Sequence, residues 1–506
     1  MKNINLIKIF LTTLVLASCA TTNNQDVSKP LAIDAPAGLE KYYAQILVWD
    51  NCIDDDDFKC AEIEVPLDYE NPDFKSITLA LKKLEANKPP LKVGSLLINP
   101  GGPGGSGVDY VSYADQAFGQ RLLDSFDIIG FDPRGVARST PIDCLTDKEV
   151  DEFIAFDGTP DNDLEIQESI KLSENMAKGC AAIADNLIAH VGTKEAAQDM
   201  DVIRAVVGDE KLYYLGASYG TYLGGMYAQL FPNKVGRLVL DGAVDPSLSG
   251  EELGLDQAIG LDTALKRFVE DCPKHDDCPL TNTGAAGVVE IRNFLDSLDE
   301  KPLKTDDPNR DLTQSMAVYA VAGFLYDNTW WSYMRQSLET AIKGDGSDLL
   351  IMVDLFNDRN EDGTFASNST EALYAINCFD TPSNVSIDEV KQMAKDWVIK
   401  APIFGDYLAW GNLACNAWPV KDLAPITTFE ANEAVPIIVV GTKFDPATPY
   451  KWAQGLSGQL ASAVLLTYEG DGHTAYMRGS KCIDQVVEDY LIEGIVPQDG
   501  LTCPKI

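Results

Sequence analysis

A serine between two closely spaced glycines is the first candidate for chemistry. The segment Leu212–Tyr222 reads LYYLGASYGTY, so Gly216, Ser218 and Gly220 form a G-x-S-x-G pattern after an apolar run. Where a strand turns sharply into a helix, such a serine is left exposed, and the residues two before and two after it crowd each other unless both are glycine. The pattern therefore predicts that Ser218 is a nucleophile.

A serine nucleophile needs a general base, and the sequence holds only three histidines. His190 lies at the expected end of an element, and His275 lies in a short loop bounded by cysteines, where a surface position is expected. His473 follows the last expected buried strand, in a glycine turn from which its imidazole could reach the serine. We therefore predict His473 as the base.

The acid that orients the base is predicted from chain order. Asp445 follows an expected strand and precedes His473, which gives the order serine, aspartate, histidine. Asp241 ends another expected strand and is the rival acid, while Asp445 could also be no more than a turn former. We favour Asp445.

A glycine-rich loop at residues 101–107 follows an apolar run and leaves the same end of the expected sheet as the serine. Glycines let backbone N–H groups approach a ligand closely. We predict an oxyanion hole formed by the N–H groups of Gly102 and Tyr219. A plain flexible turn is the alternative, and a phosphate-binding loop is disfavoured because its lysine and Ser/Thr are missing.

Alternating strand and helix patterns must position these groups. Residues 60–86 predict an antiparallel hairpin. Short apolar runs have the length of buried parallel strands, with helical patterns such as 196–207 between them; the runs are 93–98, 126–131, 212–215, 235–240, 435–440 and 463–468. The sequence therefore predicts an α/β fold, with a mostly parallel sheet, helices on both faces and an inserted, mainly helical cap.

The N-terminus predicts export. Lysines flank a short start, an apolar run follows, and Leu16-Ala17-Ser18-Cys19 resembles the lipobox of bacterial lipoproteins. That resemblance implies cleavage before Cys19, its acylation, and a lipid anchor on the periplasmic or extracellular side of a bacterial cell envelope. An uncleaved anchor or a plain secretory signal are the alternatives. The expected organisation is a signal peptide (1–18), a tether (19–39), the first part of the core (40–244), the cap (245–433) and the second part of the core (434–506).

Cysteine usage also favours an oxidising compartment. Eleven cysteines are present, and ten, an even number, remain without Cys19. Short separations suggest Cys52–Cys60 and Cys272–Cys278, and sequence order suggests Cys144–Cys180, Cys378–Cys415 and Cys482–Cys503, although connectivity does not follow from sequence alone. No spacing is typical of a zinc site, and no cofactor is called for.

The charge balance excludes one class of partner. With 78 acidic and 40 basic residues, the formal net charge is −38, so the protein cannot neutralise the phosphates of a nucleic acid. We interpret this acidity mainly as a solvated surface, which could mildly favour cationic substrates.

Several motifs follow one another in order after residue 40. They are VPLDY (65–69), the glycine loop with its preceding Asn-Pro (99–107), GFDPRG (130–135), GASYGT (216–221), LDG (240–242), DPATP (445–449) and GH (472–473). In these motifs the chain resembles the α/β-hydrolase exopeptidases of the proline iminopeptidase and tripeptidyl aminopeptidase group, especially the secreted tripeptidyl aminopeptidase-like branch. The resemblance implies Ser218 as nucleophile, Asp445 as acid and His473 as base. It also implies cleavage near the free N-terminus of a peptide, with the cap closing the site.

An aminopeptidase must hold a protonated amine, so acidic groups should face its site. Glu371 and Asp380 are the candidates, in a run that is similar to an Ala-Ile-x-Cys-x-Asp run of the family. Either could instead only cap local structure. Asp132 and Arg134 are expected to form a structural ion pair behind the serine turn.

Three functions are compatible with these residues. A serine exopeptidase is the leading hypothesis. An esterase or amide hydrolase acting on small molecules would use the same three groups. A catalytically silent surface-binding lipoprotein is disfavoured, because Ser218, Asp445 and His473 are all intact.

Overall fold

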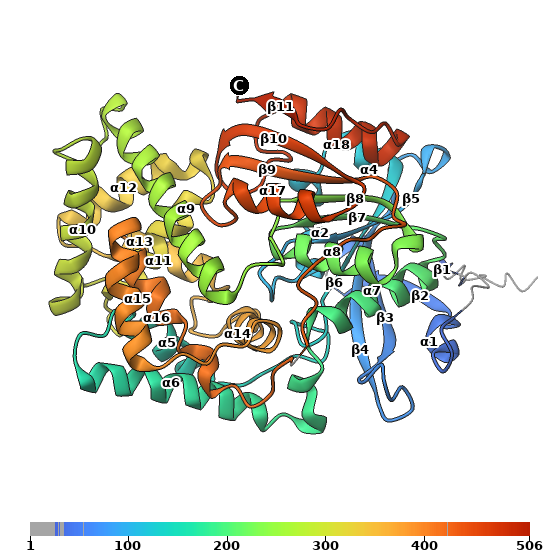
Figure 1. The fold of residues 1–506 in the computed structure, drawn as a ribbon, viewed down its shortest axis with the longest axis horizontal. Coiled ribbons are helices and arrows are strands. Elements are labelled where there is room, and N and C mark those ends of the chain that lie inside the picture. Colours follow the sequence, from blue (N-terminus) through green and yellow to red (C-terminus); the bar gives the residue numbers. More distant parts are fainter. Residues whose placement is uncertain (1–25, 29, 31–34, 54, 423, 506) are drawn as a thin grey trace, which may run out of the picture.

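The computed structural model describes residues 26–505, apart from 29, 31–34, 54 and 423 (Figure 1). The predicted signal peptide and the predicted lipidation site at Cys19 lie outside the described residues. Of the helices that are described, none combines the length and the apolar character needed to cross a bilayer.

One eleven-stranded sheet runs through the described chain, in the order β1-β2-β3-β4-β6-β5-β7-β8-β9-β10-β11. Strands β1 to β4 and the β4–β6 pair are antiparallel, and the pairs from β6 through β5 to β11 are parallel. The bounds are β1 Asp26–Ser28, β2 Leu47–Cys52, β3 Asp55–Pro66, β4 Ser76–Leu84, β5 Gly94–Asn99, β6 Phe126–Phe131, β7 Leu212–Ala217, β8 Val235–Asp241, β9 Ile437–Phe444, β10 Ala463–Asp471 and β11 Leu501–Pro504. The predicted hairpin (β3–β4) and the predicted parallel strands (β5–β10) are confirmed.

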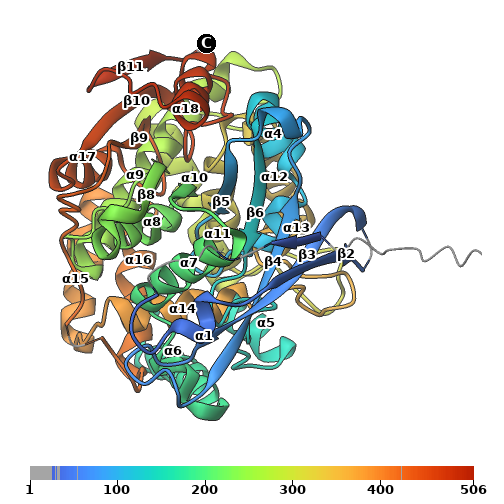
Figure 2. The same cartoon turned by 90° about the vertical axis from the view of Figure 1, so that its right-hand side faces the viewer.

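The parallel strands are continuous apolar runs because helices cover both faces of the sheet. In β8, Val239 packs into one apolar cluster, whereas Leu238 and Leu240 pack into another on the opposite face. Figure 2 shows helices on both sides of the sheet. One cluster contains α7 (Thr193–Val207), α8 (Tyr219–Leu230) and α17 (Tyr450–Gln459), and the other contains α2 (Gly107–Val111), α4 (Gln120–Ser125) and α18 (Lys481–Glu493).

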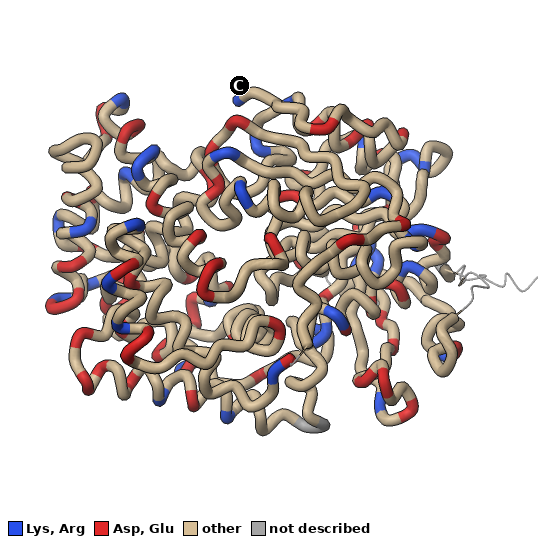
Figure 3. The backbone as a smooth tube through the Cα atoms, in the orientation of Figure 1, with Lys and Arg blue, Asp and Glu red and all other residues tan. Residues whose placement is uncertain are grey.

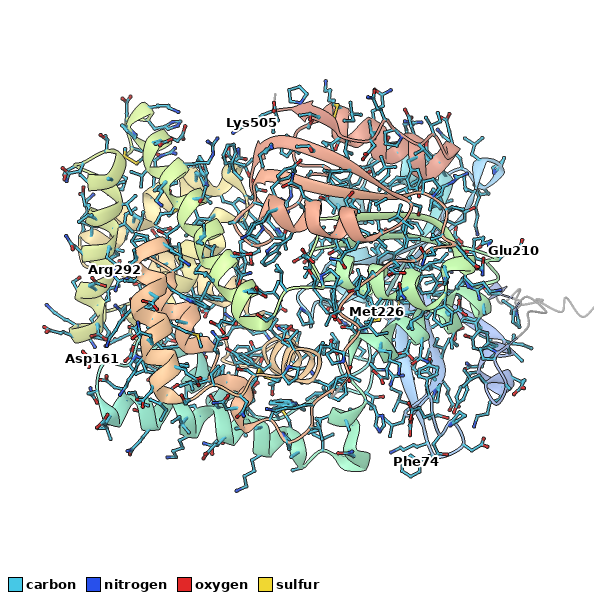
Figure 4. All side chains as sticks on the ribbon, in the orientation of Figure 1. Phe74, Asp161, Glu210, Met226, Arg292 and Lys505 are labelled. Carbon is cyan, nitrogen blue, oxygen red and sulfur yellow. A yellow bond between two sulfur atoms is a disulfide. The ribbon has the colours of Figure 1, made fainter. Side chains whose placement is uncertain are left out.

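A helical layer lies beside the sheet, at the left of Figure 1. Most of it lies between β8 and β9 in sequence, and it has its own apolar core around Phe268, Phe324 and Leu338. In Figure 4, Arg292 is labelled in this layer and Met226 on α8 beside the sheet. The helices are α9 Gly250–Asp271, α10 Gly284–Glu300, α11 Gln314–Leu325, α12 Trp331–Ile342, α13 Ser347–Phe356, α14 Ser369–Asp380, α15 Ile387–Lys400 and α16 Gly405–Gly411.

Two earlier helices join this layer. Helices α5 (Asp147–Ala155) and α6 (Asp163–Ala181) precede β7 in sequence, yet Ile166 of α6 packs with Val390 and Trp410 of α15 and α16. Short helices α1 (Glu40–Tyr43) and α3 (Ala114–Ala117) lie elsewhere. The helical layer is therefore built from two separate stretches of chain.

Disulfides tie these elements together at five places. The structure joins the pairs that short separations and sequence order suggest: Cys52–Cys60, Cys144–Cys180, Cys272–Cys278, Cys378–Cys415 and Cys482–Cys503. So many disulfides are typical of proteins that fold in an oxidising compartment outside the cytoplasm.

The expected ion pair between Asp132 and Arg134 is wrong. The guanidinium of Arg134 is fully buried and donates to both carboxylate oxygens of Asp199 on α7, at 2.8 and 2.7 Å, and to the carbonyl of Leu67. Asp132 instead accepts a hydrogen bond from the Ser106 hydroxyl at 2.5 Å. A buried guanidinium needs a carboxylate in its own plane, and α7 supplies one.

Candidate active site

Ser218 lies at the turn between β7 and α8. Its φ of 55° and ψ of −124° are strained for a residue with a side chain, and its hydroxyl does not cap α8. A Cβ built on Gly216 would lie 2.3 Å from the carbonyl oxygen of Gly220, so the predicted crowding between these glycines is confirmed. The strained turn holds Ser218, a partly exposed residue, at the end of the sheet.

The glycine loop lies against this turn. Gly101 and Gly102 have φ values of 101° and 111°. A Cβ built on Gly101 would lie 2.8 Å from the Cβ of Ser218 and 3.2 Å from the backbone nitrogen of Tyr219. Within the described chain, neither the N–H of Gly102 nor that of Tyr219 has an acceptor. Tyr219 follows Ser218 directly and Gly102 follows the glycine that contacts the turn, and their role as oxyanion donors stays a prediction.

The imidazole of His473 is oriented by Asp445. Its Nδ1 lies 2.9 and 3.1 Å from the two carboxylate oxygens of Asp445, which is 3% exposed. The same carboxylate accepts the backbone N–H groups of Ala447, Thr448 and Thr474 at 2.9–3.1 Å. These bonds fix the carboxylate, which in turn favours the tautomer with the imidazole proton on Nδ1 and leaves Nε2 as the unprotonated nitrogen.

Ser218 and His473 each lie against the residues at the end of β8. The N–H of Ser218 donates to the carbonyl oxygen of Asp241 at 2.9 Å, and a Cβ built on the next residue, Gly242, would lie 3.2 Å from Cε1 of His473. The neighbouring Nε2 is buried and has no hydrogen-bond partner among the described residues. Ser218 is thus held against Asp241 and the imidazole of His473 against Gly242, and a contact between the two side chains stays a prediction.

Asp241, the rival acid, has a different task. Its buried carboxylate accepts the backbone N–H groups of Ala475 and Tyr476 at 2.8–3.0 Å. Burial raises the pKa of Asp241 above its ordinary value. Asp241 therefore supports the chain that follows His473, whereas Asp445 contacts the imidazole itself.

Glu371 and Asp380 are buried beside the sheet. The carboxylate of Glu371 accepts the N–H groups of Cys144 and Leu145 at 3.1 Å, and that of Asp380 accepts the N–H and hydroxyl of Thr193 at 3.1 and 2.5 Å. Burial raises the pKa of each carboxyl to about 7. Each is held by groups of the core, and the role of either in binding an amine stays a prediction.

Two contacts at the site were missed by sequence reasoning. The hydroxyl of Thr193 lies 2.5 Å from the phenol oxygen of Tyr219, which links Asp380 to the residue after the nucleophile. The carbonyl of Tyr326 accepts the N–H of His473 at 2.8 Å. Both contacts join segments far apart in sequence, and no spacing or motif indicates them.

A groove of about 1110 Å³ in the helical layer does not contain the predicted site residues. Its two arginines, Arg310 and Arg359, are paired with Asp354 and Asp151 at 2.7–2.9 Å.

Among the described residues, no group of three or more His, Cys, Asp or Glu side chains is arranged to hold a metal ion.

Comparisons with known proteins agree with this geometry. The family model described as "TAP-like protein" matches residues 401–503. The chain is 37% identical over 464 residues to the serine protease Hip1 of Mycobacterium tuberculosis, covering 88% of this chain and 87% of that protein. It is 34% identical over 456 residues to a carboxylesterase B of the same organism, with coverages of 88% and 86%. It is 30% identical over 473 residues to a tripeptidyl aminopeptidase of Streptomyces lividans, with coverages of 90% and 86%.

Proposed function

Because the chain belongs to the TAP-like family of α/β-hydrolases and is a serine hydrolase, we propose that it is an exopeptidase that cleaves peptide bonds near a free N-terminus. The observation that carries the proposal is the hydrogen bond between His473 and Asp445, on an imidazole whose Nε2 has no partner among the described residues.

The mechanism follows from these positions. Nε2 of His473 takes the hydroxyl proton of Ser218 as Oγ attacks the carbonyl carbon of the substrate. The N–H groups of Gly102 and Tyr219 stabilise the resulting oxyanion. The imidazolium, oriented by Asp445, then protonates the leaving amine, and an acyl group remains on the serine. Water, deprotonated by His473, releases this acyl group and restores the enzyme.

The proposed enzyme selects substrates that have a free N-terminal amine. Two relatives are named as a serine protease and a tripeptidyl aminopeptidase, and the helical layer adjoins the base through Tyr326. We propose Glu371 and Asp380 as the carboxylates that attract the substrate ammonium. Burial raises the pKa of each carboxyl to about 7, and an ammonium bound beside it would favour the charged form.

We propose that the protein acts in the bacterial cell envelope. The basic start, the apolar run and the Leu-Ala-Ser-Cys ending at Cys19 support export and a lipid anchor. The disulfides are compatible with that compartment.

The second candidate is an esterase, because one relative is named carboxylesterase B. A substrate panel separates the two. Aminoacyl and tripeptidyl 4-nitroanilides with a free amine should be cleaved, and the same compounds with an acetylated amine should react at least tenfold more slowly. Ser218→Ala should lower amide turnover by about four orders of magnitude or more. Ser332→Ala, at an exposed serine of α12, is the matched control and should leave turnover unchanged.

Each remaining outcome counts against the proposal. Turnover of 4-nitrophenyl esters without any amide cleavage would support the esterase. Equal rates on free and acetylated amides would contradict selection of a free N-terminus. No turnover of any compound by the wild type would contradict hydrolase activity.

A further inference from the structure

The loop that carries the catalytic base is held from two sides. We call residues 471–478 the base loop. On the side of the sheet, Asp241 accepts the N–H groups of Ala475 and Tyr476, and the hydroxyl of Thr442 donates to the carbonyl of Thr474 at 2.8 Å. The opposite side of the base loop is contacted by the helical layer.

Tyr326, which follows α11, contacts the base residue itself. Its carbonyl oxygen accepts the backbone N–H of His473 at 2.8 Å. Its ring packs against the imidazole, with centroids 5.1 Å apart and planes at 73°. A Cβ built on Gly472, whose φ is 100°, would lie only 3.0 Å from the same carbonyl oxygen. Glycine at this position thus permits the base loop to approach the helical layer so closely.

Ion pairs fasten both ends of the base loop to the helical layer. At one end, the carboxylate of Asp327 pairs with Arg478 at 2.5 Å. At the other end, Arg267 of α9 pairs with Asp471. The side chains of Asp327 and Asp471 are 15% and 3% exposed, whereas those of Arg478 and Arg267 are 40% and 32% exposed, so only the carboxylate of each pair is shielded from solvent. The helical layer therefore contacts the base loop before, at and after His473.

These contacts matter for catalysis because the backbone N–H of His473 is bonded by Tyr326, whereas Asp445 bonds the imidazole ring and the N–H of the next residue, Thr474. A displacement of about 1 Å at a catalytic group can cost up to a hundredfold in rate. We propose that Tyr326 and Asp327 are positioning residues, which hold the base loop so that Nε2 of His473 faces Ser218. The helical layer then does more than cover the substrate, because the turnover rate depends on how it is seated on the base loop. This inference rests on the proposed function.

Two variants break the ion pair between Asp327 and Arg478 with little other change. Asp327→Asn removes the charge but keeps the oxygen that accepts the N–H of Thr329. Arg478→Gln removes the other charge, and Arg478→Lys restores it. The matched control is Arg335→Gln, which breaks an ion pair inside the helical layer, with Asp277 at 2.7 Å, away from the base loop. Tyr326→Leu removes the ring and leaves the backbone carbonyl.

The expected result is a loss in kcat with KM nearly unchanged. Asp327→Asn, Arg478→Gln and Tyr326→Leu should each lower kcat about tenfold. Arg478→Lys should recover most of the loss, and Arg335→Gln should have no effect. Equal losses in the control, or a change confined to KM, would overturn the proposal, because the helical layer would then act only on folding or on substrate binding. Thermal unfolding of each variant shows whether a loss in kcat is caused by misfolding. If it is, the recovery of kcat in Arg478→Lys decides the outcome.

A second readout separates this inference from the proposed function. A fluorophosphonate reacts with an activated serine whatever the natural substrate is. If wild type reacts with this probe but cleaves no peptide, the exopeptidase proposal fails and the positioning proposal is still tested by the labelling rates. Rates about tenfold lower in Asp327→Asn and Arg478→Gln support it. Rates equal to that of the wild type contradict it, as does the absence of any reaction with wild type.

Discussion

At the scale of single residues, two aspartates at strand ends have separate tasks. Asp445 bonds to the imidazole of His473, and Asp241 bonds to the backbone two and three residues beyond it. Chain order alone favours Asp445, but it does not tell what Asp241 does, since both follow buried strands. Only the spatial arrangement of β8 beside β9 and the base loop assigns both roles.

This assignment predicts unequal effects of two similar substitutions. Asp445→Asn should lower kcat by roughly 10⁴-fold with little change in KM, because the imidazole loses the acceptor that selects its tautomer. Asp241→Asn should lower kcat only about tenfold, because the remaining amide oxygen can still accept a backbone N–H. Steady-state kinetics on one 4-nitroanilide measures both. A larger loss in Asp241→Asn than in Asp445→Asn would mean that the acid is misassigned.

At the scale of elements, the end of α14 is connected to the start of α7. Asp380 accepts the N–H of Thr193, the first residue of α7, and the Thr193 hydroxyl bonds to Tyr219. The sequence predicted both helical stretches in outline but not this contact, because helix periodicity reports which face is buried and not which neighbour covers it. The sequence also did not predict the partner of Arg134, which is Asp199 on α7.

Burial of Asp380 predicts a pH dependence of stability. Its pKa is raised from 3.8 to about 7 in the folded protein, so between these values the folded state binds more protons than the unfolded state. The free energy of unfolding must therefore fall as pH rises through this window. The side chain of Asp380→Asn cannot ionise. The free energy of unfolding of this variant should therefore fall less between pH 5 and pH 8 than that of the wild type, by about 2 kcal/mol.

Urea unfolding at the two pH values measures this difference. Asp396→Asn, at an exposed position on α15, is the control and should keep the pH dependence of the wild type. If Asp380→Asn has the same pH dependence as the wild type, the carboxyl of Asp380 does not titrate in this range.

At the scale of the whole molecule, the sequence predicts the sheet better than the helical layer. Buried parallel strands produce continuous apolar runs with helices between them, and such runs are readable without a structure. The joining of α6 to α15 and α16 leaves no such signal, because it depends on contacts between distant stretches such as Ile166 with Trp410. The three proposed catalytic residues are recognisable because each follows a strand that ends at the same edge of the sheet.

Acidic residues occur throughout the described chain. Figure 3 shows acidic residues along both the sheet and the helical layer, with basic residues interspersed. This distribution agrees with the interpretation of the net charge of −38 as a solvated surface.

The central claim is that Ser218 is activated by His473. Reaction with a fluorophosphonate, followed by peptide mass spectrometry, tests it most directly. We predict one adduct, on Ser218, formed rapidly in the wild type, absent in Ser218→Ala and strongly slowed in His473→Ala. An adduct on a different residue, or labelling of Ser218 at an unchanged rate in His473→Ala, would contradict it.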